Sequence, residues 1–267
     1  MTRADVYLCA AGYAKSRSAA KELIEKGSVT LDGKTLKKAS ELVDETAEHT
    51  VLVKKEPFVC RGGLKLEGAI SAFGTDVSGK TCIDIGASTG GFTDCLLSHG
   101  AKKVYAVDSG HGQLDPSLAS RDDVVNIEGY NARNLKREDF DTDFDIAVMD
   151  VSFISQTYIH AGIYDVLGDG GVIISLIKPQ FEAGRHAVGK NGIVKKKEDR
   201  EAALRRVIDS AASCGLYCRD VIRSPIEGGD GNIEYLALFT KEAGGTLFPP
   251  TKIKILAEGR KTNGDGT

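Results

Sequence analysis

The chain of 267 residues is 41% hydrophobic and 27% charged, which is typical of a globular protein and excludes a collagen, a coiled coil and a disordered chain. Domains of about 100–200 residues are usual, so we expect one large or two modest domains. The net charge of −3 hides an uneven distribution. Residues 1–65 carry 12 Lys and Arg against 9 Asp and Glu, a net charge of +3, and residues 66–267 carry 23 against 29, a net charge of −6. This asymmetry predicts two parts with different tasks and favours a nucleic-acid partner.

The sequence predicts neither a membrane span nor a secretory signal. Its longest uncharged apolar run, 170–177, has eight residues, whereas a membrane-spanning helix needs about 20. No apolar segment with a cleavage site follows the N-terminus, so we expect a cytoplasmic protein with reduced cysteines. The six cysteines show no C-x-x-C spacing and no accompanying pair of histidines, and we therefore expect no metal site.

The first 55 residues are expected to form a small helical unit with short strands. The predicted elements are a short helix ending at Gly12, a helix over 17–26, and strands over 29–31 and 50–53. Ser16 precedes the second helix as an N-cap residue, and Gly27 follows it as a terminator. The pair Asp32-Gly33 predicts a tight hairpin turn after the first strand.

From residue 81 onward, short apolar strands alternate with amphipathic segments. Strands are predicted over 81–85, 103–108, 124–128, 145–150 and 171–177, and helices over 92–99 and 198–213. The tail after Pro250 is expected to be frayed. This alternation predicts a mostly parallel sheet with helices on both faces, whose ligands bind beyond the carboxyl ends of the strands.

A glycine-rich turn follows the first of these strands, in Asp84-Ile85-Gly86-Ala87-Ser88-Thr89-Gly90-Gly91. With Asp108 ending the next strand, the pattern fits either a dinucleotide site or an S-adenosylmethionine site. Two features favour the methyl donor. Ser88 stands where a dinucleotide site has a glycine, and Asp84 suits a cationic amino group better than a pyrophosphate. The alternative is that the glycines only allow the helix to pack closely on the strand.

Charged residues also end the later strands. Asp150 and Lys178 each follow an apolar strand on the expected ligand side, where charged groups are almost never placed without a partner. Lys65 stands ahead of a predicted short helix, and Glu234 interrupts the apolar segment 233–238. Each of these two residues, taken alone, is typical of a solvated or salt-bridged side chain.

Taken together, these segments resemble a known family. The resemblance is carried by residues 84–94, 150–155, 178–184 and 231–234, and near the N-terminus by residues 3–8 and 16–20. They resemble the TlyA group, bacterial proteins often labelled hemolysin A that are similar to ribosomal RNA 2′-O-methyltransferases. The group joins an N-terminal RNA-binding domain of the ribosomal protein S-four type to an FtsJ-type methyltransferase domain. The resemblance covers roughly residues 3–240.

The resemblance implies an α/β fold. It comprises a Rossmann-like S-adenosylmethionine-dependent methyltransferase domain, with a mostly parallel seven-stranded sheet covered by helices on both faces, and a small α+β N-terminal RNA-binding domain. The implied boundaries are 1–55 for RNA binding, 56–62 for a linker, 63–245 for methyl transfer and 246–267 for a C-terminal tail. The residues expected to bind S-adenosylmethionine are Asp84, Gly86, Ser88, Thr89, Gly90, Gly91, Phe92, Asp108, Asn131 and Asp150.

FtsJ-type enzymes use a Lys-Asp-Lys-Glu tetrad, which the resemblance places at Lys65, Asp150, Lys178 and Glu234. A ribose 2′-hydroxyl must lose its proton during methyl transfer, and a free lysine, with an ordinary pKa of about 10.4, is protonated. Burial and a neighbouring cation favour the neutral amine. We therefore expect Lys178 to be the general base and Lys65 the neighbouring cation, with Asp150 orienting Lys178 and Glu234 positioning Lys65 or the ribose.

Ribosomal RNA, or a ribosomal subunit, is the expected partner. The expected RNA-binding residues are Arg3, Lys15, Arg17, Lys21, Arg61, Arg185 and Lys190. Arg185 and Lys190 belong to a basic, glycine-containing loop over 180–197 that we expect to be flexible, the alternative being an ordinary solvated loop. Two other functions stay open: a ribosome assembly factor without essential catalysis and, remotely, a membrane-active hemolysin. The second is disfavoured because no suitable amphipathic or spanning segment is found.

Overall fold

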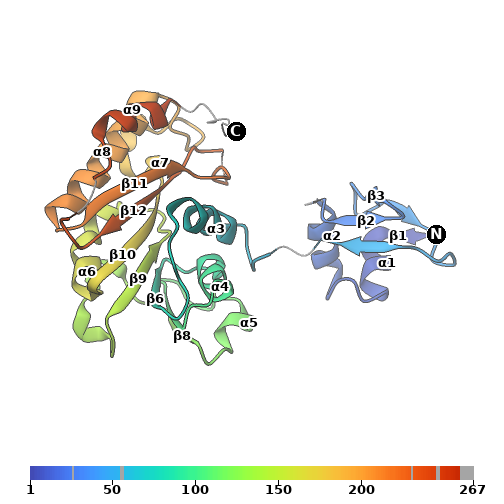
Figure 1. Ribbon diagram of the computed structural model, residues 1–267. Coiled ribbons are helices and arrows are strands. Elements are labelled where there is room, and N and C mark those ends of the chain that lie inside the picture. Colours follow the sequence, from blue (N-terminus) through green and yellow to red (C-terminus); the bar gives the residue numbers. More distant parts are fainter. Residues whose placement is uncertain (26, 55–56, 230, 245–246, 259–267) are drawn as a thin grey trace. The chain divides into compact units, whose positions relative to one another are not determined.

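The computed structural model describes residues 1–25, 27–54, 57–229, 231–244 and 247–258 (Figure 1). The chain divides into two compact units, residues 1–57 and residues 58–267. The boundary falls within the segment expected to be a linker. Phe58 is buried in the second unit, and Gly62 already begins a helix.

Unit 1 packs two helices against short antiparallel strands. Its elements are β1 (Thr2–Arg3), α1 (Ala4–Ala10), α2 (Arg17–Glu25), β2 (Val29–Leu31), β3 (Lys34–Thr35), β4 (Leu42–Val43) and β5 (Val51–Val53). β1 pairs with β4, and β2 pairs with both β3 and β5. The core is formed by Ala4, Leu8, Ala20, Ile24, Val29, Leu36 and Val43.

Short-range signals in unit 1 are confirmed. Ser16 Oγ accepts a hydrogen bond from Ala19 N at 3.2 Å and so caps α2. Asp32 and Gly33 have φ values of 51° and 76°, which is the geometry of a two-residue hairpin between β2 and β3. Lys26, the predicted last residue of the second helix, lies outside the described residues.

Unit 2 is built on a seven-stranded sheet with the strand order β11-β12-β10-β9-β6-β7-β8. Its strands are β6 (Thr81–Ile85), β7 (Lys103–Val107), β8 (Val124–Ile127), β9 (Phe144–Met149), β10 (Leu167–Ile177), β11 (Tyr217–Arg223) and β12 (Tyr235–Thr240). The strands β6 to β10 are parallel, and β12 lies antiparallel between β10 and β11. The predicted mostly parallel seven-stranded sheet is therefore confirmed.

Helices cover both faces of this sheet (Figure 1). One face carries α3 (Gly62–Phe73), α4 (Gly91–Ser98) and α5 (Pro116–Ala119), and the other carries α6 (His160–Val166), α8 (Lys197–Ser213) and α9 (Pro250–Ala257). The connections contain α7 (Pro179–Glu182), η1 (Ala132–Asn134), η2 (Arg137–Asp139), η3 (Gln156–Tyr158) and η4 (Arg185–Ala187). Within the described part of the chain, no helix combines the length and apolar character needed to cross a membrane.

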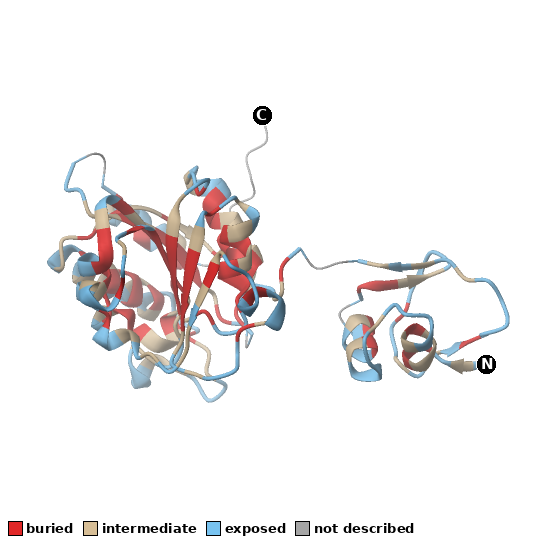
Figure 2. Cartoon of the chain, turned by 90° about the horizontal axis from the view of Figure 1, so that it is seen from below, coloured by how far each residue is buried: buried red, intermediate tan, exposed pale blue. Residues whose placement is uncertain are grey.

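Because successive residues of a strand point to opposite faces, each strand of this sheet contributes to apolar layers on both sides of it. Figure 2 shows buried residues along the strands of unit 2 and on the helices beside them. In β6, Ile83 and Ile85 join the core beneath α6 and α8, whereas Cys82 joins the core beneath α3 and α4. Asp84 shares the parity of Cys82, so it also faces the helix that follows the glycine turn. The alternation of the strand thus places one carboxylate inside an apolar layer.

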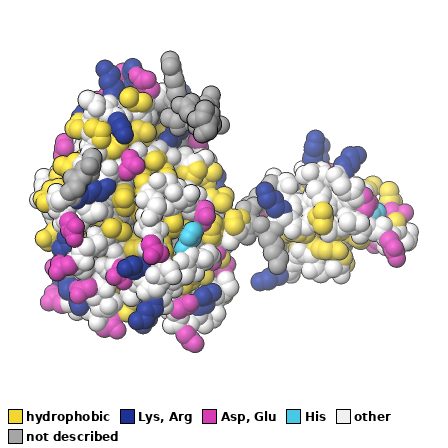
Figure 3. Space-filling model, in the orientation of Figure 1, with side chains coloured by type: hydrophobic (Ala, Val, Ile, Leu, Met, Phe, Trp, Pro, Cys, Tyr) yellow, Lys and Arg dark blue, Asp and Glu magenta, His cyan; other side chains and the backbone are white. Residues whose placement is uncertain are grey.

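The surfaces of both units carry charges of both signs. Figure 3 shows Lys and Arg side chains on the visible face of unit 1, and it shows Asp and Glu side chains interspersed with Lys and Arg on the visible face of unit 2. On that face of unit 2, the acidic excess of residues 66–267 is therefore distributed and does not form one continuous acidic patch.

Two local predictions are wrong. The sequence places Lys65 ahead of a helix, but α3 already begins at Gly62. The reason is that Gly63 lets the helix lie against the Phe58 ring, where an added Cβ would come within 2.4 Å of the ring. The segment after Pro250 is expected to be frayed, yet residues 250–257 form α9. This helix is held because Ile253 is buried against the core and because the buried Arg200 of α8 donates two hydrogen bonds to the carbonyl oxygen of Ala257. Residues 259–267 lie outside the described residues.

Candidate active site

The turn after β6 brings the backbone close to the end of β9. Gly86 has a φ of 85°, and a Cβ there would lie 2.6 Å from the carbonyl oxygen of Asp150. Gly90 has a φ of 95°, and its Cβ would lie 2.4 Å from Leu118 Cδ1. Both positions therefore require glycine. Gly90, an expected cofactor residue, packs against Leu118 and is not among the residues that line the two cavities at this turn.

Asp84 is fully buried in β6 next to this turn. Its Oδ2 accepts a hydrogen bond from Thr93 Oγ1 at 2.7 Å, whereas its Oδ1 has no hydrogen-bond partner among the described residues. Burial raises the pKa of Asp84 to about 7, and the neighbouring carboxylates of Asp150 and Asp108 also raise it. A buried carboxylate with a free oxygen is costly unless a donor or a cation satisfies it. This position is therefore suited to a cationic group of a ligand.

Two adjoining cavities lie at the carboxyl ends of β6, β7 and β9. The larger has a volume of about 510 Å³ and the smaller about 240 Å³. They share Gly86, Ser88, Asp150 and Ser152. The remaining expected cofactor residues are distributed between them: Asp108 and Asn131 line the larger cavity, and Thr89, Gly91 and Phe92 line the smaller one. Apart from Gly90 and the buried Asp84, the sequence-predicted cofactor residues therefore surround one continuous space.

Asp108 also shapes the glycine turn. Its Oδ2 accepts a hydrogen bond from Ser88 N at 2.8 Å, and its Oδ1 accepts one from Gly110 N at 2.7 Å. Each carboxylate oxygen can accept a second hydrogen bond, so Asp108 keeps capacity for ligand hydroxyls. Asn131 caps η1 by accepting a hydrogen bond from Arg133 N at 3.1 Å.

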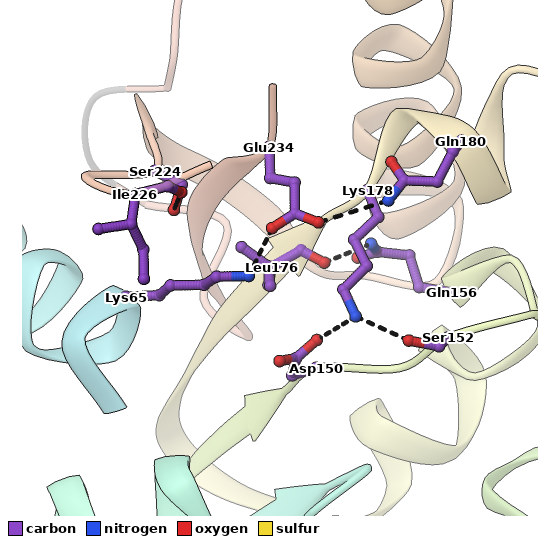
Figure 4. A network of polar contacts seen from close by, with 10 residues as sticks. All are labelled: Lys65, Asp150, Ser152, Gln156, Leu176, Lys178, Gln180, Ser224, Ile226 and Glu234. Carbon is purple, nitrogen blue, oxygen red and sulfur yellow. Dashed lines mark hydrogen bonds and ion pairs between the residues drawn. The ribbon is translucent and has the colours of Figure 1, made fainter. Parts of the chain in front are cut away.

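Four charged side chains form two ion pairs at the edge of the smaller cavity (Figure 4). Lys178 Nζ lies 2.5 Å from Asp150 Oδ1 and donates a hydrogen bond to Ser152 Oγ at 2.8 Å. Lys65 Nζ lies 2.6 Å from Glu234 Oε2, and this second pair is almost completely buried. Lys65, Asp150 and Lys178 line the cavity. Glu234 is not among the lining residues, but it forms the ion pair with Lys65. The structure thus brings all four predicted catalytic residues together.

The sheet topology explains why these four residues meet. Asp150 follows β9 and Lys178 follows β10, and these strands are parallel neighbours whose carboxyl ends lie at the same edge. Glu234 precedes β12, which is antiparallel to β10, so it reaches that edge from the opposite direction. Gln180 Nε2 donates a hydrogen bond to the other carboxylate oxygen of Glu234, Oε1, at 3.4 Å (Figure 4). Lys65 completes the group from the first turns of α3.

Sequence reasoning missed the aromatic residue next to this group. Phe153 is 92% exposed and has a φ of 63°, an unfavourable backbone conformation for a bulky residue. Its ring centroid lies 5.2 Å from that of Phe181, and Lys178 Nζ lies 5.9 Å from the Phe181 centroid. Phe153 lines both the 510 Å³ cavity at the glycine turn and a third cavity of about 530 Å³. Its place in Asp150-Val151-Ser152-Phe153 was visible in the sequence, but its exposure was not.

Three of the expected RNA-binding residues belong to unit 2 and are exposed. Arg61 lines the smaller cavity, Arg185 lines the third cavity, and Lys190 lies on the surface of the basic loop. The loop is expected to be flexible, but its far end is anchored. Asn232, which is buried, accepts a hydrogen bond from Val194 N at 3.0 Å and donates one to the carbonyl oxygen of Gly192 at 2.9 Å.

The other four expected RNA-binding residues belong to unit 1. Arg3 and Arg17 lie 2.9 and 3.1 Å from the carboxylate oxygens of Asp5, and these contacts, with Arg3 the stronger, lower the pKa of Asp5 to about 2. Lys21 lies 3.6 Å from Glu25, and Lys15 is exposed. The two arginines thus share one buried carboxylate, and the two lysines extend into solvent.

Comparison with known proteins agrees with this architecture. Residues 58–241 match the family of FtsJ-like methyltransferases, and residues 2–49 match the S4 domain. A solved structure of an S-adenosylmethionine-dependent methyltransferase from Mesorhizobium loti shares the fold, with a TM-score of 0.50 and 16% identity over 65% of this chain and 96% of that chain.

Much more similar relatives cover both units. "Hemolysin A" of Brachyspira hyodysenteriae is 45% identical over 239 residues, which are 89% of this chain and 99% of that protein. The 16S/23S rRNA (cytidine-2′-O)-methyltransferase TlyA of Mycobacterium tuberculosis is 40% identical over 234 residues, 87% of each chain. A solved structure of a hemolysin-named protein from Streptococcus thermophilus has a TM-score of 0.76 and 41% identity, covering 96% of this chain and 94% of that one. The chain therefore belongs to the FtsJ-like methyltransferase family, within the group of TlyA and hemolysin A proteins, and carries an S4 domain at its N-terminus.

Proposed function

We propose that this protein is an S-adenosylmethionine-dependent ribosomal RNA 2′-O-methyltransferase. The observation that carries the proposal is the convergence of Lys65, Asp150, Lys178 and Glu234 beside a cavity that continues into the larger cavity at the glycine turn. The name of the Mycobacterium tuberculosis relative supports ribosomal RNA, and a cytidine ribose, as the substrate. A ribosomal substrate would also place the protein in the cytoplasm.

The residues at the glycine turn fit S-adenosylmethionine. The free Oδ1 of Asp84 suits the positively charged amino group, and Asp108 can accept hydrogen bonds from ribose hydroxyls. The larger cavity, of about 510 Å³, lies within the usual range of about 300–1,000 Å³ for small-molecule sites. When bound, S-adenosylmethionine supplies an electrophilic methyl group on a sulfonium.

The chain's own residues would activate the ribose hydroxyl. We assign Lys178 as the general base that takes the proton from the 2′-hydroxyl, because its amine lines the smaller cavity and is held by Asp150 and Ser152. Lys65 places a second positive charge at the same cavity, and Glu234 keeps that charge in position. A general base typically contributes about 10²–10⁴-fold to the rate, and alignment of the reacting groups contributes much of the rest.

The surroundings of this group suit a nucleotide. The exposed ring of Phe153 lies against the half-buried ring of Phe181 next to Lys178, and an unstacked base can lie on it. Arg61 and Arg185 are exposed at the adjoining cavities, where they can bind phosphates. Exposed lysines of the S4 domain, among them Lys15 and Lys21, would supply further phosphate contacts.

The decisive experiment is incubation of unmodified small and large ribosomal subunits with methyl-labelled S-adenosylmethionine, followed by mapping of the labelled nucleotide. We expect the label on a ribose, and Lys178→Ala should abolish its transfer while leaving S-adenosylmethionine binding, measured by calorimetry, within about twofold. No label on either subunit, despite binding of both ligands, would contradict the enzyme proposal and favour a ribosome-binding factor. Full turnover by the Lys178 variant would contradict the assignment of the base.

A further inference from the structure

Outside the candidate active site, three side chains that commonly bind metals converge between α3 and α4. His99 Nε2 lies 2.7 Å from Glu67 Oε2, and Cys95 Sγ lies 3.7 Å from the same oxygen. All three ligand atoms lie within 4.8 Å of one another. We propose that Glu67, Cys95 and His99 form a binding site for one divalent transition-metal ion of the zinc class.

Helix geometry explains how the three residues meet. Cys95 lies in α4 and His99 is the C-cap residue of that helix, four positions later, so both side chains project from the same face. Glu67 projects toward them from α3, which packs against α4. The sequence predicts no metal site because it has neither a C-x-x-C motif nor a pair of histidines. The third ligand comes from another helix, 28 residues before Cys95, which no local motif reveals.

The distances suit a tetrahedral ion after a small adjustment. With bond lengths of about 2.0–2.1 Å to nitrogen and oxygen and about 2.3 Å to sulfur, tetrahedral ligands lie about 3.3–3.5 Å apart. The sulfur–oxygen distance of 3.7 Å is close to this value, and the nitrogen–oxygen distance of 2.7 Å must lengthen by about half an ångström. The side chains of His99 and Glu67 are 32% and 45% exposed, so they have the freedom to move.

The chemistry of the three ligands favours a borderline metal over calcium or magnesium. A thiolate and an imidazole select zinc-class ions, whereas hard cations require oxygen ligands. Binding would release the thiol proton, and the thiolate and carboxylate would then offset the charge of the divalent ion. Cys95 is fully buried, whereas the side chains of Glu67 and His99 reach solvent. The solvent-facing side of the site therefore has room for a water as the fourth ligand.

A metal at this position would join two helices that border the candidate active site. Lys65, which lines the smaller cavity, precedes Glu67 by two residues in α3. Phe92, at the start of α4, lines the same cavity. Without the ion, the Glu67–His99 contact is a half-exposed pair, which typically contributes little to stability. We therefore expect the ion to fix the spacing of the two helices more strongly than this pair does.

The test uses cobalt(II) as a spectroscopic probe on the full-length, untagged and metal-free chain. Thiolate coordination produces a near-ultraviolet charge-transfer band and tetrahedral geometry produces strong visible bands. We expect both, with a stoichiometry of one ion per chain and displacement of cobalt by zinc. Absence of the charge-transfer band in the wild-type chain, whose fold is checked by circular dichroism, would overturn the proposal.

Variants then identify the ligands. His99→Gln removes a half-exposed ligand with little risk to folding, and it should raise the dissociation constant for zinc more than tenfold. Cys95→Val keeps the apolar packing and should abolish the charge-transfer band. His111→Gln, at an exposed histidine elsewhere in unit 2, is the control and should change neither value. Unchanged zinc affinity in His99→Gln, or a charge-transfer band that survives in Cys95→Val, would refute this set of ligands.

Discussion

Lys65 and Glu234 form the more deeply buried of the two ion pairs in the candidate active site, with side chains that are 8% and 3% exposed, against 12% and 22% for Lys178 and Asp150. Removing one partner of a buried pair leaves an uncompensated charge, which typically costs about 3–5 kcal/mol. We predict that Glu234→Gln lowers the free energy of unfolding by about this amount, and that Asp150→Asn lowers it by less. Urea denaturation of the two variants measures the difference.

The double variant Lys65→Met/Glu234→Gln tests the cause of this decrease. It removes both charges, so it should recover part of the stability that Glu234→Gln alone removes. Equal decreases in Glu234→Gln and Asp150→Asn, or no recovery in the double variant, would show that burial of the Lys65 charge is not the cause.

Asp84 is expected to oppose stability while supporting cofactor binding. Its pKa in the folded chain, about 7, exceeds the ordinary value of about 3.9, so the folded chain binds more protons than the unfolded chain between these pH values. The contribution of this group to stability therefore falls as the pH rises from about 4 to 7 and then stays constant. We predict that Asp84→Asn is more stable than the wild type at pH 8, by up to about 4 kcal/mol, and that the gain shrinks toward pH 4.

The same variant should bind S-adenosylmethionine more weakly, because the amino group loses its anionic partner. Denaturant titrations at pH 5, 6, 7 and 8 and calorimetry at pH 8 measure the two effects. A variant that is less stable than the wild type at pH 8, or that binds the cofactor equally well, would contradict this account of Asp84.

Phe153 combines a left-handed backbone with an almost fully exposed ring, which is a strained arrangement that packing does not explain. Strain of this kind favours a role in binding. We predict that Phe153→Gly raises the free energy of unfolding by about 1 kcal/mol, because glycine relieves the strain, and lowers kcat/KM for ribosomal RNA by about 5- to 150-fold, because a stacked base contributes about 1–3 kcal/mol. Denaturation and methylation assays test the two effects separately.

Ile255→Ala is the control for this change, because it removes another exposed apolar side chain, from α9, and lines none of the three cavities described above. It should leave methylation unchanged. If Phe153→Gly is stabilised but methylates at the wild-type rate, the exposed ring does not receive the substrate.

At the scale of elements, the basic loop before α8 depends on its connection to the turn before β12. The buried Asn232 binds both the backbone amide of Val194 and the carbonyl oxygen of Gly192. We predict that Asn232→Ala costs about 1–3 kcal/mol of stability, because the buried amide loses its partner. Hydrogen exchange at Val194 should accelerate strongly. Asn191→Ala, at an exposed position of the same loop, is the matched control, and equal exchange rates in both variants would contradict the anchoring role.

Residues at the ends of strands could be predicted from the sequence, whereas contacts between segments far apart in the chain could not. Asp150 and Lys178 could be placed in the site because each ends an apolar strand, and the carboxyl ends of parallel strands must meet at one edge of the sheet. The anchoring by Asn232 could not be predicted, since it joins a loop and a turn that are 38 residues apart without any periodic signal. The early start of α3 was hidden for a similar reason, because glycines usually end helices, and only the contact with Phe58 shows why Gly63 lies inside one.

At the scale of the whole molecule, the chain divides into two compact units with separate cores. Residues 1–57 carry 10 Lys and Arg against 9 Asp and Glu, a net charge of +1, and residues 58–267 carry 25 against 29, a net charge of −4, so much of the positive excess of residues 1–65 comes from Arg61 and Lys65 of unit 2. Such a division allows RNA affinity and cofactor affinity to be changed independently. Lys15 and Lys21 of unit 1 are suited to test this. Both are exposed, and Lys21 makes only a surface pair with Glu25 at 3.6 Å, whereas Arg3 and Arg17 are both held by the buried Asp5.

We predict that Lys15→Ala/Lys21→Ala weakens binding of ribosomal RNA and lowers the slope of log K against log salt concentration by about 0.7–0.9 for each phosphate that the variant no longer neutralises. Binding of S-adenosylmethionine should stay unchanged, because its proposed site lies within unit 2. Lys252→Ala/Lys254→Ala, which removes two exposed lysines of α9, is the matched control for net charge. RNA binding is measured by filter retention at several salt concentrations. An unchanged slope in the unit 1 variant, or an equal decrease in the α9 variant, would show that unit 1 does not supply the phosphate contacts.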